Sequence, residues 1–94
     1  MKVEWSAAAL ADLDRFADFL QDRFPKLAKV VGREITQKSD LLIEHPELGR
    51  PLPFRPDLRQ LVLRVLNASY VIHYRVMPHR LVILRVFHGR ESRE

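Results

Sequence analysis

The spacing of apolar residues changes once along this chain, close to residue 57. Before that point, apolar side chains recur every three or four residues, which is the period of an α-helix. After it, they alternate with polar side chains, which is the period of a β-strand. The chain has 94 residues, a length that favours one domain over residues 1–94. Helices followed by strands predict an α+β fold, with helices packed on one face of a sheet.

The first half predicts a short strand and two helices. Residues 1–5 alternate and indicate a first or edge strand. Ser6 is a good N-cap for an amphipathic helix that runs to about Phe24. Pro25 can occupy the first position of a second helix. We expect that helix to stop by Glu44, because a proline follows two residues later. The two helices should form an antiparallel hairpin.

The second half predicts three antiparallel strands, over residues 58–66, 69–76 and 80–87. Short turns at 67–68 and 77–79 join them, which is typical of antiparallel neighbours. A connection that contains four prolines, residues 45–57, precedes the strands. Because proline restricts the backbone, we expect this connection to be ordered. The predicted order is β-α-α-β-β-β: an N-terminal strand, a two-helix hairpin and a three-stranded antiparallel sheet.

Alternation assigns each strand residue to one face of the sheet. In the last strand, one face should carry Leu81, Ile83, Arg85 and Phe87. The other face should carry Val82, Leu84 and Val86. Charged side chains are rarely buried without a partner. We therefore expect the open face to hold the polar exceptions Arg64, His73, Arg75 and Arg85. The carboxylates of the helices are expected to be solvated.

Charge is distributed unevenly along the chain. Residues 1–57 carry 9 Lys and Arg against 10 Asp and Glu, a net −1, whereas residues 58–94 carry 7 against 2, a net +5. All seven cations of the second half are arginines, whose planar guanidinium suits bidentate pairing with carboxylates and phosphates. Two interpretations stay open: a solvated sheet face, or a surface that binds an anionic partner, either nucleic acid or an acidic protein.

Several kinds of chemistry are excluded by composition. The chain has no cysteine, so disulfides, zinc–thiolate sites and thiol nucleophiles are absent. No apolar run approaches the roughly 18 residues of a membrane span, and no signal peptide precedes the first helix. A cytoplasmic protein is expected. The three glycines form no phosphate-binding loop, and the four histidines lie in separate elements. We therefore expect neither a metal ion nor another cofactor.

The remaining chemistry is acid–base catalysis by arginine and histidine. Cleavage of RNA needs a base, an acid and cations that stabilise the phosphorane. The best local candidate is His88, which is close in sequence to Arg85 and Arg90. The alternative is that His88 ends a strand, where it contacts a partner or caps the backbone.

Several segments in order resemble the toxins of the ParE/RelE superfamily. These are the N-terminal strand, the pair Asp12-Leu13, residues 44–50 (EHPELGR), residues 70–76 (YVIHYRV) and residues 83–90 (ILRVFHGR). The resemblance covers nearly the whole chain. It implies a bacterial, cytoplasmic toxin of a type II toxin–antitoxin module, with two helices packed on a small antiparallel sheet. It also implies a hetero-oligomer with an antitoxin, whose tail wraps the toxin along the groove between helices and sheet.

The superfamily contains two functional classes. RelE-like members cut messenger RNA in the ribosomal A site, and ParE-like members bind DNA gyrase. Arg64 and Arg90 match two RelE cations, but Val62 and Val71 stand where other RelE strand cations are found, and no tail tyrosine follows. The resemblance therefore favours the ParE class. If the chain is an RNase, the catalytic residues are expected to be Arg64, His88 and Arg90.

Two binding surfaces follow from this interpretation. Target binding is assigned to the end of the last strand, namely Arg85, Phe87, His88 and Arg90. An aromatic side chain flanked by arginines is typical of an interface hot spot. Antitoxin binding is assigned to Arg64, His73, Arg75, Leu13, Phe16 and Leu20, although the core is the alternative role of the apolar members. A plain nucleic-acid-binding module is the third possibility and would require strongly salt-dependent binding.

Overall fold

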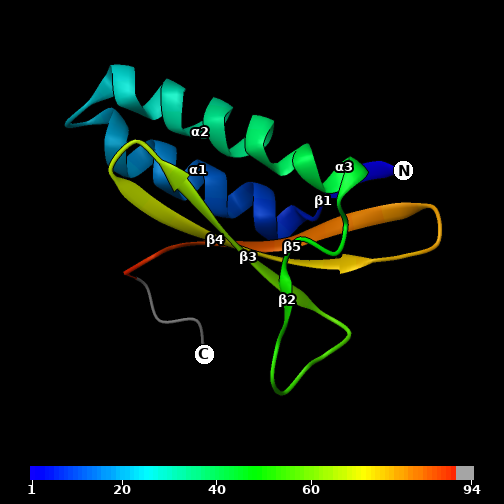
Figure 1. Cartoon of the computed structure of the whole chain (residues 1–94). Helices are drawn as coiled ribbons and strands as arrows, with labels where there is room; N and C mark the ends of the chain where they lie inside the picture. The colour runs from blue at the N-terminus through cyan, green and yellow to red at the C-terminus, as the bar shows by residue number, and fades with distance from the viewer. Residues whose placement is uncertain (91–94) are drawn as a thin grey trace.

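Two layers make up the computed structural model, which describes residues 1–90: a helical layer covers one face of a five-stranded sheet (Figure 1). The elements are β1 (Lys2–Trp5), α1 (Ala7–Gln21), α2 (Pro25–Ser39), α3 (Leu41–Glu44), β2 (Arg50–Pro51), β3 (Arg59–Val65), β4 (Ala68–Val76) and β5 (Arg80–His88). The strands are arranged in the order β1-β5-β4-β3-β2. The predicted α+β class and order of elements are confirmed.

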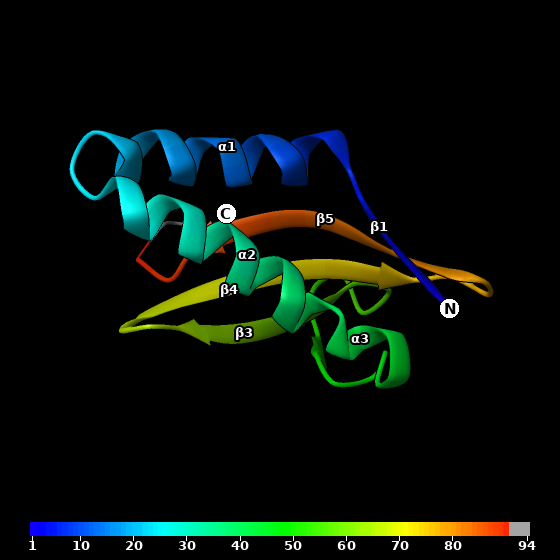
Figure 2. The same cartoon turned by 90° about the horizontal axis from the view of Figure 1, so that it is seen from above.

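The helices begin where the sequence predicts. The Ser6 hydroxyl accepts a hydrogen bond from the Ala9 N–H at 3.0 Å, so Ser6 caps α1. Pro25 occupies the first turn of α2, and α1 and α2 run antiparallel over the sheet (Figure 2). Phe24 is not helical (φ −142°, ψ 71°), because the residue before a proline disfavours that geometry. Helix α1 therefore ends before Phe24. At Asp40, the predicted second helix divides into α2 and α3.

The sheet is larger than predicted and mixed. Strands β3, β4 and β5 are antiparallel, as expected, but β1 pairs in parallel with β5 from Lys2–Arg80 to Trp5–Ile83. A short strand within the proline-containing connection, β2, pairs with the start of β3. Pro51 lies at this sheet edge, where its missing N–H does not interrupt a central ladder. Local periodicity does not predict either pairing, because β1 and β5 are far apart in the sequence and β2 is only two residues long.

The prediction that Leu81 and Ile83 share a sheet face with Arg85 and Phe87 was wrong. The register between β4 and β5 shifts at His73/Tyr74, where Tyr74 pairs with Ile83 and His73 with Arg85, so that Leu84 is the extra residue of a β-bulge. A bulge reverses the alternation that follows it. Leu81, Ile83 and Val86 are therefore all fully buried. The sequence had predicted Val86 on the opposite sheet face from Leu81 and Ile83, but all three side chains lie on the core face.

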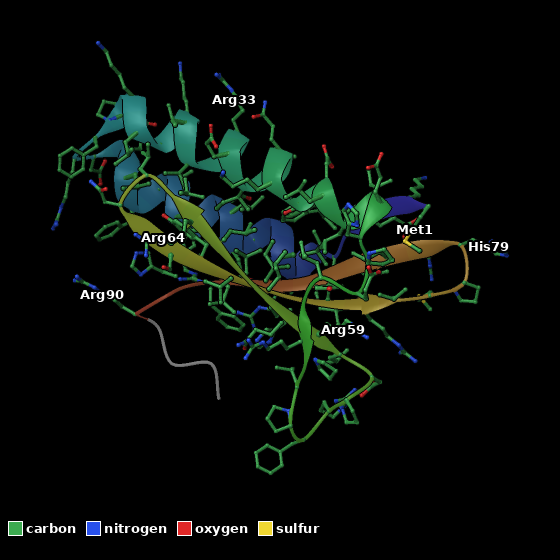
Figure 3. The ribbon with its side chains drawn as sticks, viewed as in Figure 1. Met1, Arg33, Arg59, Arg64, His79 and Arg90 are labelled. Atoms are coloured by element: carbon green, nitrogen blue, oxygen red, sulfur yellow. The ribbon has the colours of Figure 1, made fainter. Side chains whose placement is uncertain are left out.

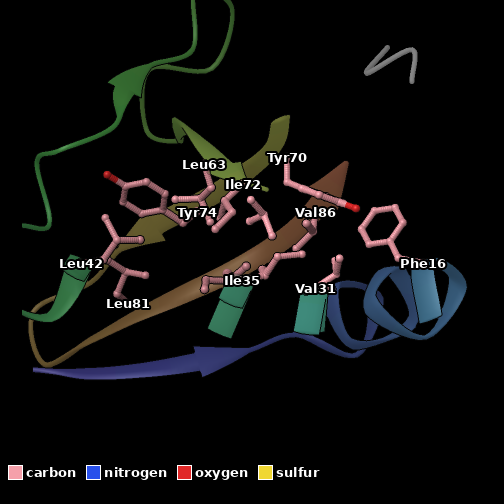
Figure 4. Close-up of a cluster of buried hydrophobic side chains, with 13 residues drawn as sticks. Phe16, Val31, Ile35, Leu42, Leu63, Tyr70, Ile72, Tyr74, Leu81 and Val86 are labelled. Carbon is pink, nitrogen blue, oxygen red and sulfur yellow. The ribbon is translucent and has the colours of Figure 1, made fainter. Parts of the chain in front are cut away.

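The hydrophobic core lies between the helices and the sheet (Figure 4). Helix α2 contributes Val31 and Ile35, and the strands contribute Ile72, Tyr74 and Leu81 among others. On the other face of β4, Val71, His73 and Arg75 alternate with these core residues. The expected placement of Arg64, His73, Arg75 and Arg85 on the face away from the core agrees with the strand register.

Candidate functional site

An apolar groove opens where the helical hairpin overhangs one end of the sheet. Its volume is about 540 Å³. The lining combines the end of α1, the start of α2 and the adjoining ends of β4 and β5: Arg15, Phe16, Phe19, Leu20, Leu27, Ala68, Tyr70, His88 and Arg90. Phe19 remains 63% exposed. Carbon atoms dominate the floor, while two arginines and a histidine provide charge and hydrogen-bond donors, so the groove suits an apolar peptide segment with acidic ends.

Aromatic contacts shape the floor of this groove. The Phe16 and Tyr70 rings meet edge to face with centroids 5.2 Å apart, and the Tyr70 and His88 rings do so at 5.3 Å. The Arg15 guanidinium lies 4.8 Å from the centroid of the Phe16 ring. The Nδ1 atom of His88 accepts a hydrogen bond from the Arg90 N–H at 3.2 Å. In the neutral ring the proton therefore resides on Nε2.

A buried carboxylate joins α1 to the edge of β5. Asp12 is only 4% exposed. Its oxygens accept hydrogen bonds from Arg85 Nε at 2.8 Å, Arg85 Nη2 at 3.0 Å and the Val86 N–H at 2.8 Å, and from Arg15 Nη2 at 3.2 Å. Strand β1 pairs with β5 only up to Ile83. Beyond that point, the Asp12 carboxylate takes the hydrogen bond that a neighbouring strand would otherwise accept.

The protonation of Asp12 follows from these contacts. Burial by itself raises the pKa of Asp12, but the hydrogen bonds from Arg85, Val86 and Arg15 stabilise the carboxylate and outweigh that effect. The pKa therefore lies below its ordinary value of 3.8. The prediction that the helix carboxylates are solvated was wrong for Asp12. Its partners on β5, Arg85 and Val86, lie more than 70 residues away in the sequence, so helical spacing contained no signal for these contacts.

The open face of the sheet carries one polar row and one apolar row. In the polar row, His73 lies between Gln60 and Arg85, and its Nε2 is 3.1 Å from Gln60 Oε1. In the apolar row, Val71 lies between Val62 and Phe87. The two rows interlock at Phe87, because the His73 ring centroid lies 5.1 Å from that of Phe87 and the Arg85 guanidinium lies 4.9 Å from it.

The four residues assigned to target binding do not form one continuous surface. Phe87 is 8% exposed on the open face, and Arg85 is bonded to Asp12. His88 and Arg90 instead line the groove on the helix side. Successive strand residues alternate between the faces, which separates Arg85 and Phe87 from His88. The β-bulge at Leu84 decides that His88 is the one on the helix side.

The residues assigned to antitoxin binding also lie on two sides. Phe16 and Leu20 line the groove, and Leu13 packs against the core nearby. The cationic members Arg64, His73 and Arg75 lie on the open face. Of the residues assigned to an RNase, Arg64 and Arg90 lie at one end of the sheet (Figure 3). Phe19 and Leu27 of the groove were not assigned to a binding site, although Phe19 interrupts the polar stripe of its helix.

Two structural absences apply to the described chain. Among residues 1–90, no group of three or more His, Cys, Asp or Glu side chains is arranged to hold a metal ion. No helix within the same residues is long and apolar enough to cross a membrane.

The fold has close counterparts among solved structures. A chain of the chromosomal ParDE toxin–antitoxin system from P. aeruginosa superposes with a TM-score of 0.79 and 25% identity, covering 94% of this chain and 95% of that one. The conserved hypothetical protein HP0894 from Helicobacter pylori superposes with a TM-score of 0.57 over 97% of each chain. At 15% identity, that second match supports the fold alone. The fold is therefore that of the RelE/ParE toxins.

Sequence comparison identifies the family. Residues 3–93 match the model of the ParE toxin of the type II toxin–antitoxin system parDE. Toxin RelE1 of Caulobacter vibrioides is 31% identical over 94% of this chain and 92% of its own length. Toxin RelE3 of the same bacterium is 32% identical over 97% of both chains. The chain belongs to the ParE toxin family and is the toxin of a type II toxin–antitoxin system, which implies a cognate antitoxin as its partner.

Proposed function

We propose that this toxin inhibits DNA gyrase and that its antitoxin neutralises it. The observation that carries the proposal is the apolar row on the open sheet face, formed by Val62, Val71 and Phe87. The RelE-type nucleases that the chain resembles have strand cations at the positions of Val62 and Val71. Without those cations, the face stabilises developing phosphorane charge poorly. Val71 and Phe87 are buried, and Val62, which is 54% exposed, offers apolar contact to a protein partner instead.

The placement of the candidate catalytic groups supports the same proposal. An acid or base must reach the proton that it transfers, at hydrogen-bond distance. Arg64 lies on the open face, whereas the His88 ring lies on the helix side against Tyr70. The nearby Arg85 guanidinium is paired with Asp12. A substrate phosphate placed at Arg64 therefore has His88 on the opposite side of the sheet.

A supercoiling assay with purified gyrase tests the proposal. We expect the toxin to inhibit supercoiling and to cause cleaved DNA to accumulate, and the cognate antitoxin to restore activity. Relaxation of the same plasmid by a type I topoisomerase is the control, because it should remain unaffected unless the toxin merely coats DNA. Normal supercoiling at saturating toxin would overturn the proposal.

We place part of the target contact at the end of β5, where the predicted residues Arg85, Phe87, His88 and Arg90 lie. Arg90 is exposed and lies two residues past the end of the strand. Arg85 and Phe87 support this end through their contacts with Asp12 and with each other. We expect Arg90→Ala to raise the toxin concentration needed for half inhibition of gyrase by about 10-fold, the usual effect of losing one well-packed arginine at an interface.

A ribosome-dependent RNase is the second candidate, because the matched Caulobacter relatives are named RelE toxins. In that case, expression should produce new transcript ends on translating ribosomes. Arg64→Ala and His88→Ala should each remove those ends without unfolding the protein. Unchanged transcript ends after expression of the wild type would exclude this candidate.

For the antitoxin, we propose the groove as the main binding site. Its wall presents Phe19 and Leu20 to solvent next to Arg15 and Arg90. Apolar side chains of an antitoxin segment would fill the groove, and acidic side chains beside them would meet the arginines. The open face, with Arg64, His73 and Arg75, is the second predicted antitoxin contact.

A further inference from the structure

A projecting arm, residues 50–58, is held firmly at its base. It hangs from the sheet on the side away from the helices (Figure 1). The buried Tyr74 hydroxyl accepts a hydrogen bond from the Gly49 N–H at 2.8 Å and donates one to the Pro46 carbonyl at 2.7 Å. Arg59 donates to the Gly49 carbonyl at 2.7 Å. A Cβ atom on Gly49 would lie 2.7 Å from the Tyr74 ring, so this approach requires glycine.

The tip of the arm is closed on itself. The Leu52 N–H donates to the Leu58 carbonyl at 2.9 Å, and the Leu58 N–H donates to the Arg55 carbonyl at 2.9 Å. The Arg55 guanidinium makes two hydrogen bonds to the Asp57 carboxylate, at 3.2 and 3.1 Å. Three prolines further restrict the backbone: Pro51, Pro53 and Pro56. The arm is therefore ordered before any partner binds.

At this tip, Phe54 is 96% exposed. The next most exposed large apolar side chain, Phe19 at 63%, lines the antitoxin groove. Isolated apolar side chains on a surface are common. An aromatic ring on a rigid support is different, because burying it in a partner gains contact area at little cost in conformational entropy.

A second hollow, of about 350 Å³, adjoins the base of the arm. Leu48 and Val62 line it and remain about half exposed. Arg50 borders it from the arm, and Gln60 and Leu61 complete the lining. The apolar surface therefore continues from the arm onto β3, as in an interface in which a central anchor is surrounded by further contacts.

The charge around the arm indicates what it binds. Residues 50–59, the arm and the residue that holds its base, contain three arginines (Arg50, Arg55 and Arg59) and one acidic residue, Asp57, a net of +2. Arg55 is held by Asp57 and Arg59 by backbone carbonyls, whereas Arg50 is exposed. An aromatic anchor with one exposed cation beside it and two paired ones matches an apolar pocket with an acidic rim better than a continuous phosphate backbone, which favours rows of free cations.

We propose that the arm is the target-recognition element of this toxin and inserts Phe54 into an apolar, acid-rimmed pocket of the target protein. This inference rests on the proposed function, in that the target is taken to be a protein. It goes further by assigning recognition to a segment separate from the groove. The arm lies on the sheet side, so a toxin whose groove is filled still presents Phe54.

The test uses Phe54→Ala and the matched control Phe24→Ala, which removes a 57%-exposed ring at the tip of the helical hairpin. Growth arrest after induced expression reports engagement of any target, and gyrase supercoiling reports the proposed one. We expect Phe54→Ala to relieve growth arrest and to raise the half-inhibitory concentration by about 10- to 100-fold, the range for a fully buried phenyl ring. Its melting temperature should match that of the wild type, and Phe24→Ala should remain toxic.

The variant Phe54→Leu distinguishes insertion into a protein pocket from stacking on a nucleic-acid base. An apolar pocket accepts leucine with a loss of a few-fold, whereas stacking on a nucleic-acid base requires the aromatic ring. A Leu variant as weak as the Ala variant would therefore overturn the protein pocket in favour of nucleic acid. A Phe54→Ala variant that arrests growth like the wild type would overturn the proposal altogether. If the wild type arrests growth without inhibiting gyrase, gyrase is not the target, and growth arrest alone decides the role of the arm.

Discussion

Asp12 connects the first helix to the last strand through three hydrogen bonds on one carboxylate, and Arg15 of the same helix donates a fourth. A buried acceptor of this kind is costly to remove, because its donors lose their partner inside the protein. Arg85 in turn is held beside Phe87. One helix residue therefore determines the position of two residues that the sequence assigned to target binding.

We expect Asp12→Ala to lower the free energy of unfolding by about 2–4 kcal/mol, since it leaves the Val86 N–H and the Arg85 guanidinium without their acceptor. Urea unfolding at pH 7 measures this loss. Asp14→Ala is the matched control, because Asp14 is exposed on the same helix, and it should change stability by no more than about 0.5 kcal/mol.

The same residue predicts a dependence of stability on pH. The pKa of Asp12 is lowered in the folded protein, so its contribution is fully present above the unfolded pKa, near 4, and is lost as the pH falls through the folded value. The stability difference between the wild type and Asp12→Asn should therefore be constant from pH 5 to 7 and shrink below about pH 4. A difference that is equally large at pH 3 would contradict this assignment.

At the scale of elements, the turn between β3 and β4 differs from the prediction. The turn was expected at residues 67–68, but Val65 pairs with Ala68, so the two loop residues are Leu66 and Asn67. Leu66 has φ +56°, in the left-handed region that disfavours a side chain with a Cβ. A two-residue hairpin with positive φ at its first loop position favours glycine there.

We therefore expect Leu66→Gly to stabilise the protein by about 0.5–1 kcal/mol, because relief of backbone strain exceeds the added entropy of the unfolded chain. Differential scanning calorimetry should show a melting temperature a few degrees higher. Asn67→Gly is the control: Asn67 has no positive φ, so glycine there should not stabilise. Equal gains at both positions would refute the strain argument.

On the scale of the whole molecule, the two sheet faces have different roles in our proposals. The helix side carries the apolar groove, and the opposite side carries the arm and the open-face cations. Antitoxin and target would thus contact different sides, which meet at the end of β5. Neutralisation would then require the antitoxin to reach beyond the groove to the open face or the arm.

Phe19→Asp tests this division of roles. The side chain is 63% exposed, so the fold should tolerate the change, while a charge in the groove should weaken binding of an apolar antitoxin segment by at least about 10-fold. Calorimetric titration with the antitoxin from the same operon measures the loss. Growth arrest should be retained. Retained antitoxin affinity would show that the groove is not the main binding site.

Local spacing was enough to predict the order of elements, the cap at Ser6, the start of α2 at Pro25 and the open-face position of His73 and Arg75. These features depend on neighbouring residues, whose backbone preferences and periodicity act within one or two turns. The groove was predicted only as a place between helices and sheet. That Phe19 and Leu27 line it became clear only from the tertiary structure.

Tertiary structure decided which residues meet. The bulge at Leu84 places His88 in the groove and Arg85 on the open face, and Asp12 reaches Arg85 across 73 positions of sequence. Strand register and contacts between distant elements depend on how the whole sheet packs against the helices, and a shift of one residue exchanges the faces. The sequence alone showed that the second half is rich in arginine. Which of these arginines lie on the open face and which line the groove was decided by the packing of the sheet against the helices.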